Sequence, residues 1–123
     1  MKPTHQDRID SLISHFWRNG YLTVSRKFGT YLPPPRPIGN YEIDAVGKYK
    51  KAYVFGLVLT ENDFNNPRIK NKIEYLASQN TKYSNRRVKL YIGVPKPFFE
   101  NLNNILSELP KENRDNIKII IIN

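Results

Sequence analysis

Residues 40–60 have the sequence NYEIDAVGKYKKAYVFGLVLT, which decides the fold. Two runs rich in β-branched and aromatic residues flank the segment Gly47-Lys48-Tyr49-Lys50-Lys51. Such runs around a short turn are typical of an antiparallel hairpin. The first strand of this hairpin is acidic, the second is almost wholly apolar, and the tip is cationic.

Helical and strand patterns alternate on both sides of this hairpin. Thr4 is a suitable N-cap for an opening helix, and Asp7 three residues later gives a start that resembles a capping box. The helix has an apolar stripe of Ile9, Leu12, Ile13, Phe16 and Trp17, and Asn19-Gly20 ends it. Asn66 and Pro67 have the chemistry of a second helix start. The remaining predicted elements are strands at 21–31, 88–94 and 117–122, a helix from about residue 97 to 109 and a turn at 111–116. The order α-β-β-β-α-β-α-β predicts a single α/β domain over residues 1–123, with a central mixed sheet flanked by helices.

Composition limits the class of protein and the class of partner. A chain of 123 residues with 39% apolar content is long enough for one packed core, and no apolar run is long enough to span a membrane. Nothing at the N-terminus resembles a secretory signal, and the lack of cysteine excludes disulfides and thiolate metal sites, so we expect an intracellular, cytoplasmic protein. Twenty Lys and Arg against eleven Asp and Glu give a net charge of +9, which attracts polyanions and makes nucleic acid the leading partner. A Lys-rich surface that serves only solubility is the alternative.

Two segments of the hairpin carry a resemblance to a known family. They are Glu42-Ile43-Asp44-Ala45-Val46 and Lys51-Ala52-Tyr53-Val54-Phe55-Gly56-Leu57-Val58-Leu59-Thr60. With the opening helix, they resemble the restriction-endonuclease-like fold of the PD-(D/E)XK superfamily, and within it the small archaeal Holliday-junction resolvases, over residues 5–95. The resemblance implies that Asp44 is the aspartate of the second strand, a ligand of Mg²⁺ or Mn²⁺ if the protein is an active nuclease. The third strand of such enzymes supplies an acid and, two residues later, a lysine.

This sequence departs from that motif on the third strand. Gly56 stands at the position of the acid and Val58 at that of the lysine. Glu42 lies two residues from Asp44 on the same strand, and Glu61 lies just beyond the third strand, so both are candidates for a migrated catalytic acid. If the acid has been lost, we expect packing to close the space at Gly56, with Val54 and Val58 facing the core. An inactive protein is therefore favoured over an active enzyme.

Three functions follow from these observations. The first is binding of nucleic acid, with DNA favoured over RNA, by a protein of nuclease-like fold that lacks the complete catalytic site. The second is a metal-dependent endonuclease of DNA or RNA with migrated residues. The third is a protein assembly factor, a homodimer if the apolar C-terminal strand pairs with a second copy. The residues expected to contact nucleic acid are Lys48, Tyr49, Lys50, Lys51, Arg68, Lys72, Lys82, Arg86 and Arg87.

Overall fold

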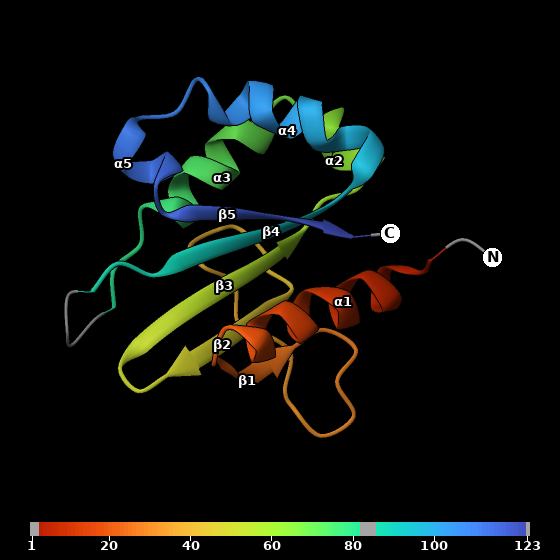
Figure 1. Cartoon of the computed structure of the whole chain (residues 1–123), viewed down its shortest axis with the longest axis vertical. Helices are drawn as coiled ribbons and strands as arrows, with labels where there is room; N and C mark the ends of the chain where they lie inside the picture. Colours follow the sequence, from red (N-terminus) through yellow and green to blue (C-terminus); the bar gives the residue numbers. More distant parts are fainter. Residues whose placement is uncertain (1–2, 82–85, 123) are drawn as a thin grey trace.

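A central mixed β-sheet organises the protein (Figure 1). The computed structural model describes residues 3–81 and 86–122, and in these ranges the sheet has five strands in the order β1-β2-β3-β4-β5. The first two strand pairs are antiparallel, and β3, β4 and β5 are parallel to one another. The predicted single α/β domain with a mixed sheet is confirmed. The strands are β1 (Leu22–Arg26), β2 (Ala45–Tyr49), β3 (Ala52–Val58), β4 (Lys89–Pro95) and β5 (Ile117–Ile122).

Helices cover both faces of the sheet (Figure 1). The helix α1 (His5–Arg18) lies across one face, because Ile9, Leu12, Ile13 and Phe16 form an apolar stripe that is buried against the strands. The opposite face is covered by α3 (Ile69–Ala77) and α4 (Phe99–Leu106), whose apolar residues form a second core with β3 and β4. Short helical turns complete the chain: α2 (Glu61–Phe64), the 3₁₀ helix η1 (Lys96–Phe98) and α5 (Lys111–Arg114).

Both ends of α1 are fixed by local hydrogen bonds. The Thr4 hydroxyl accepts the Asp7 N–H at 3.1 Å, and the Asp7 carboxylate accepts the Thr4 N–H at 2.9 Å, which completes the expected capping box. At the C-terminus, Gly20 takes a left-handed φ of 87°, and the Tyr21 N–H donates to the Phe16 carbonyl at 2.9 Å. This is a Schellman turn, which sends the chain from α1 directly into β1.

Some predicted boundaries differ from the structure. The second predicted helix is α3, which begins at Ile69, and Asn66 instead accepts the Arg68 N–H at 2.9 Å within the preceding turn. The first strand ends at Arg26, ahead of the left-handed Phe28. A proline-rich connection over residues 32–39 follows without joining the main sheet. The segment expected to be a turn before β5 contains α5.

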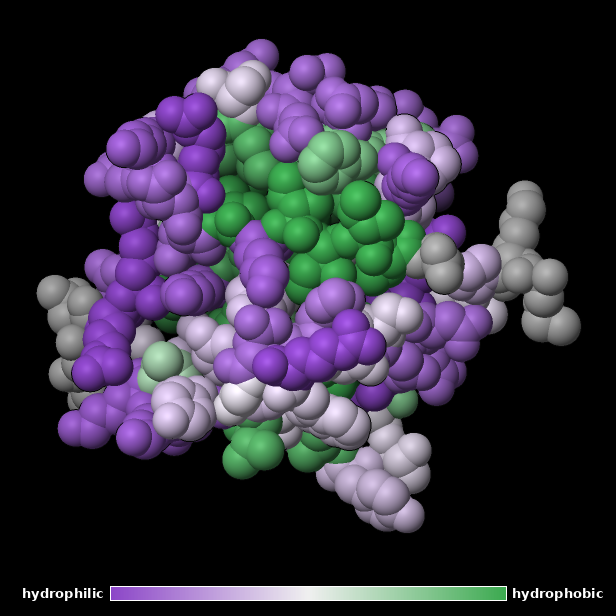
Figure 2. Space-filling view, viewed as in Figure 1, coloured by the Kyte–Doolittle hydropathy of each residue, from purple (hydrophilic) through white to green (hydrophobic). Residues whose placement is uncertain are grey.

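The β2–β3 hairpin turns sharply at its cationic tip. Tyr49 pairs with Ala52, so that Lys50 and Lys51 form the turn, and Lys50 has a left-handed φ of 53°. At the far side of the sheet, β5 pairs only with β4 among the described residues, and Ile121 is half exposed. Figure 2 shows a hydrophobic region in the middle of the view, where β5 lies in Figure 1. Pairing of this edge with a second copy stays a prediction. In the described ranges, no helix combines the length and the apolar character needed to cross a membrane.

Candidate functional site

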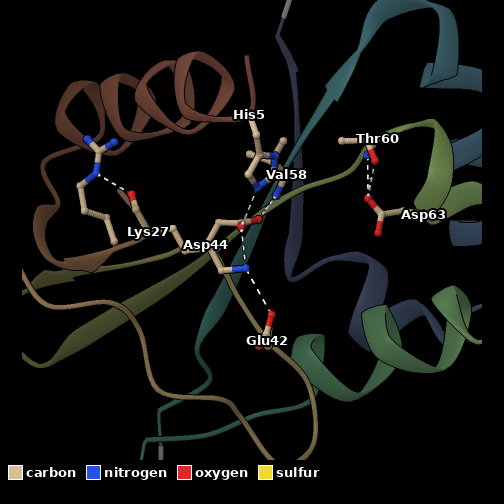
Figure 3. Close-up of polar contacts among 8 residues, drawn as sticks. His5, Lys27, Glu42, Asp44, Val58, Thr60 and Asp63 are labelled. Carbon is tan, nitrogen blue, oxygen red and sulfur yellow. Dashed lines mark hydrogen bonds and ion pairs between the residues drawn. The ribbon is translucent and has the colours of Figure 1, made fainter. Parts of the chain in front are cut away.

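Asp44 lies at the centre of a buried polar cluster just before β2. Its residue is only 3% exposed, and its Oδ2 accepts the Val58 N–H at 2.7 Å. Its Oδ1 lies 3.3 Å from His5 Nε2 and 3.6 Å from Lys27 Nζ (Figure 3). The helix α1, the loop after β1 and the end of β3 therefore meet at this carboxylate. Because hydrogen bonds and a cation offset its burial, Asp44 is a structural anchor for all three elements.

A small cavity of about 280 Å³ opens beside Asp44. Glu42 is exposed at its rim, where its Oε2 lies 3.4 Å from Lys27 Nζ. The Asp63 carboxylate accepts the Thr60 N–H at 2.7 Å and the Thr60 hydroxyl at 3.1 Å, which fixes the start of α2 (Figure 3). The cavity is lined by His5, Lys27, Glu42, Asp44, Leu57, Val58, Thr60, Asp63 and Lys72. Three acids, two lysines and a histidine therefore balance one another around it, and we call this region the pocket end.

The residues present do not fit the divalent metal that the resemblance implies. A Cβ added at Gly56 would lie 2.8 Å from Leu12 Cδ2 and 2.8 Å from Phe16 Cζ, so the α1 core fills the space that an acid would need. Val54 and Val58 are buried in the same core, as expected from the sequence. Within residues 3–81 and 86–122, no group of three His, Cys, Asp or Glu side chains is arranged to hold a metal ion. No catalytic step through a metal follows from this geometry.

The candidate catalytic acids are only partly brought together. Asp44 and Glu42 both line the cavity and both contact Lys27, but Glu61 is exposed in the first turn of α2 and is not among the lining residues. Asp63, two residues on, lines the cavity in its place. Sequence reasoning missed His5 and Lys27, whose contacts with Asp44 cross the fold. No local pattern around either residue signals them.

The opposite end of the sheet has a different charge pattern. No Asp or Glu occurs at 11–41, 45–60 or 75–99, and these segments contain the C-terminal half of α1, the hairpin tip and the start of β4. Lys118 Nζ lies 3.3 Å from the Asn19 Oδ1, so the start of β5 reaches the same end. We call this region the basic end, and define it by the exposed cations Arg18, Lys48, Lys50, Lys51, Lys89 and Lys118.

The cations of the basic end lack acidic partners. None of the six has a carboxylate within 4.0 Å in the part of the chain that the structure describes. Three of them instead lie near aromatic rings: Lys48 Nζ is 5.3 Å from the centre of Tyr53, Lys50 Nζ is 5.5 Å from that of Tyr49, and Lys118 Nζ is 5.4 Å from that of Tyr91. Their charges therefore remain available to an external anion.

The pKa of His15 reflects the excess of positive charge at the basic end. Burial lowers its pKa below the ordinary value of 6.5, and the nearby charges of Arg18 and Lys118 lower the pKa further. Both cations disfavour a proton on the imidazole. Three basic side chains from α1 and β5 thus face one another at the end of α1.

The residues predicted to contact nucleic acid do not all lie at the same end of the sheet. Lys48, Tyr49, Lys50 and Lys51 form the hairpin tip at the basic end. Arg86 and Arg87 precede β4, and Arg87 donates to Asn113 Oδ1 at 2.8 Å. Arg68 directly precedes α3, and Lys72 lies in the first turn of that helix and lines the cavity of the pocket end. Lys82 lies outside the described residues.

Comparisons with known proteins assign neither a family nor a function to this chain. No protein-family model, curated protein or solved structure matches this chain.

Proposed function

We propose that this protein binds nucleic acid, with DNA favoured, through phosphate contacts at the basic end. The observation that carries the proposal is the separation of charge. Exposed cations that have no carboxylate partner among the described residues gather at one end of the sheet, whereas the acids near Asp44 are paired internally. Uncompensated Lys and Arg side chains release counterions when they contact phosphates, and this release drives binding to nucleic acid.

The arrangement of these cations favours recognition of the backbone over reading of base sequence. Lys48 and Lys51 project from a narrow hairpin, and Arg18 and Lys118 come from a helix end and an edge strand. Ammonium and guanidinium groups on separate elements suit phosphates, which are the same in every sequence. The proposed surface also lies at the other end of the sheet from Asp44, because β3 begins at the hairpin tip and ends beside Asp44 (Figure 1).

Removing two charges from the hairpin tip tests this function. We expect the double variant Lys48→Gln and Lys51→Gln to bind duplex DNA more weakly than the wild type at low salt. The slope of log affinity against log salt should fall in magnitude by roughly 2, about one unit for each lost phosphate contact. Fluorescence anisotropy with labelled DNA over a series of salt concentrations measures both quantities.

A control variant with the same change in net charge distinguishes contacts made at the basic end from the effect of the protein's total charge. Arg36 lies in the proline-rich connection and Lys96 in η1 at the end of β4, and both are exposed. The double variant Arg36→Gln and Lys96→Gln should retain the wild-type salt slope. Equal slopes for the two double variants would contradict a specific surface at the basic end, and no measurable binding of DNA by the wild type at low salt would contradict the function itself.

A further inference from the structure

An open groove with an apolar lining lies at the basic end, beside the last turn of α1. It has a volume of about 430 Å³ and is lined by Trp17, Gly20, Tyr21 and Leu22. Trp17 is 66% exposed and Leu22 is 73% exposed, although both are large apolar side chains. Apart from Gly20 and its two chain neighbours, no heavy atom of the described residues lies within 4 Å of the position that a Cβ would take at Gly20, so this turn leaves the groove uncovered. Such exposed apolar surface marks a binding site more often than chance placement does.

The groove has cations around it. Arg18 follows Trp17 in the sequence, and Lys48 pairs with Leu22 across the β1–β2 ladder. Asp10 lies two turns before Trp17 on the same side of α1 and forms an ion pair with Arg26 of β1. This side of the helix therefore faces β1. The other flank faces β5, because Asn19 accepts a hydrogen bond from Lys118. Cations therefore lie on both sides of the last turn of α1, and the apolar groove lies where that turn leads into β1.

We infer that this groove binds an unpaired base of single-stranded nucleic acid, stacked on Trp17, while Arg18, Lys48 and Lys118 contact the adjoining phosphates. The inference rests on the proposed function and specifies its substrate class. A nucleotide has an apolar base face beside a charged phosphate, and the groove places an indole beside unpaired cations in the same way. The surrounding positive charge disfavours a second copy of this chain, which would bring the same cations into the contact.

Duplex DNA is a poorer match to the groove than a single strand. Its bases are stacked inside the helix and offer no face to an aromatic side chain, so Trp17 and Leu22 would meet only the sugar-phosphate backbone. A single strand has free base faces and gains affinity for each base that stacks on an aromatic residue. We therefore expect tighter binding of single strands than of duplexes.

The sequence has one tryptophan, so intrinsic fluorescence reports on this groove directly. Titration with an oligothymidylate should quench Trp17, and titration with heparin, a polyanion without bases, should bind with little quenching. Trp17→Ala should weaken binding of the oligothymidylate roughly tenfold, with a smaller effect on a duplex of the same length, and Trp17→Phe should restore most of the loss. Because Trp17 is mostly exposed, its truncation should leave the thermal unfolding midpoint close to that of the wild type.

Tyr31→Ala is the matched control, since Tyr31 is 96% exposed, lies just before the proline-rich connection and is not among the residues that line the groove. It should bind oligothymidylate as the wild type does. Equal loss in both aromatic variants, equal affinity for single strand and duplex, or an unchanged Trp17 spectrum on binding would overturn the inference and leave the proposed function standing. No binding of any nucleic acid would overturn both. A dimer seen by light scattering that Trp17→Ala abolishes would assign the groove to a protein interface instead.

Discussion

The two ends of the sheet use charged residues for different purposes. At the pocket end, Asp44 is buried and its oxygens are within hydrogen-bonding or ion-pair distance of Val58 N–H, His5 and Lys27. At the basic end, the exposed Lys48, Lys51 and their neighbours have no carboxylate partner in the described structure. Charges that are satisfied internally stabilise a fold, whereas charges left unpaired at a surface remain available for a partner.

This contrast places the proposed site at the end of the sheet away from Asp44, the residue that the sequence suggested as a metal ligand. The acid position on β3 is Gly56, and α1 fills the volume next to it. Packing closes the space beside Gly56, and a hydrogen bond from Val58 N–H and the nearby Lys27 hold the Asp44 carboxylate in place. Asp44 is then expected to matter for stability and to have little effect on binding.

The largest expected effect is that of Asp44→Ala. The change leaves the buried Val58 N–H without its acceptor and Lys27 without one of its partners, so we expect a loss of about 2–4 kcal/mol in the free energy of unfolding. Urea denaturation followed by circular dichroism measures it. Glu42→Ala is the control, because Glu42 is exposed and contacts the same lysine, and it should cost about 0.5 kcal/mol or less. Similar losses in the two variants would contradict the anchoring role of Asp44.

A second prediction tests whether the α1 core truly fills the acid position. Gly56→Ala would place a Cβ 2.8 Å from both Leu12 and Phe16, so it should destabilise the protein by about 1–3 kcal/mol through overpacking. Gly93→Ala on the neighbouring β4 is the matched control, because its Cβ would meet the flexible end of Ile122 at 3.0 Å and should cost less. A Gly56→Ala variant as stable as the wild type would show that space for a side chain remains there.

The sequence allowed prediction of the elements because each has a local signal. The apolar stripe of α1, its capping box and the two strand-forming runs around the cationic turn all involve residues close in the chain, and the structure contains each of them. Packing at Gly56 was also expected, since Val54 and Val58 share its strand face. The partners of Asp44 were not predicted, because His5 is 39 residues away and only the crossing of α1 over the end of β3 brings them together.

The difference between local signals in the sequence and contacts that only the fold creates also explains which residues of the basic end were not predicted. Lys48 to Lys51 were evident as a run of charge, but Arg18 and Lys118 are 100 positions apart in the numbering and meet only through the helix–sheet contact. Trp17 was expected on the apolar stripe of the first helix, yet it is mostly exposed, because it lies at the flank of the buried face. Local periodicity predicts which side of a helix is apolar, but the neighbouring strands decide how far the covered surface extends.

The smallest expected effect is a pH dependence of binding at His15. In the free protein its pKa is lowered by burial and by Arg18 on α1 and Lys118 on β5, so the imidazole is mostly neutral at pH 6.5. A phosphate bound beside these cations would offset their charge and raise the pKa of His15, so that binding takes up a proton and affinity increases as the pH falls below 6.5. We expect a gain of about threefold, the scale of one exposed ionic contact. Anisotropy titrations over this pH range measure it, with His15→Gln losing the dependence and His5→Gln keeping it. A pH dependence that survives in His15→Gln would place the titrating group elsewhere and separate His15 from the phosphate-binding surface.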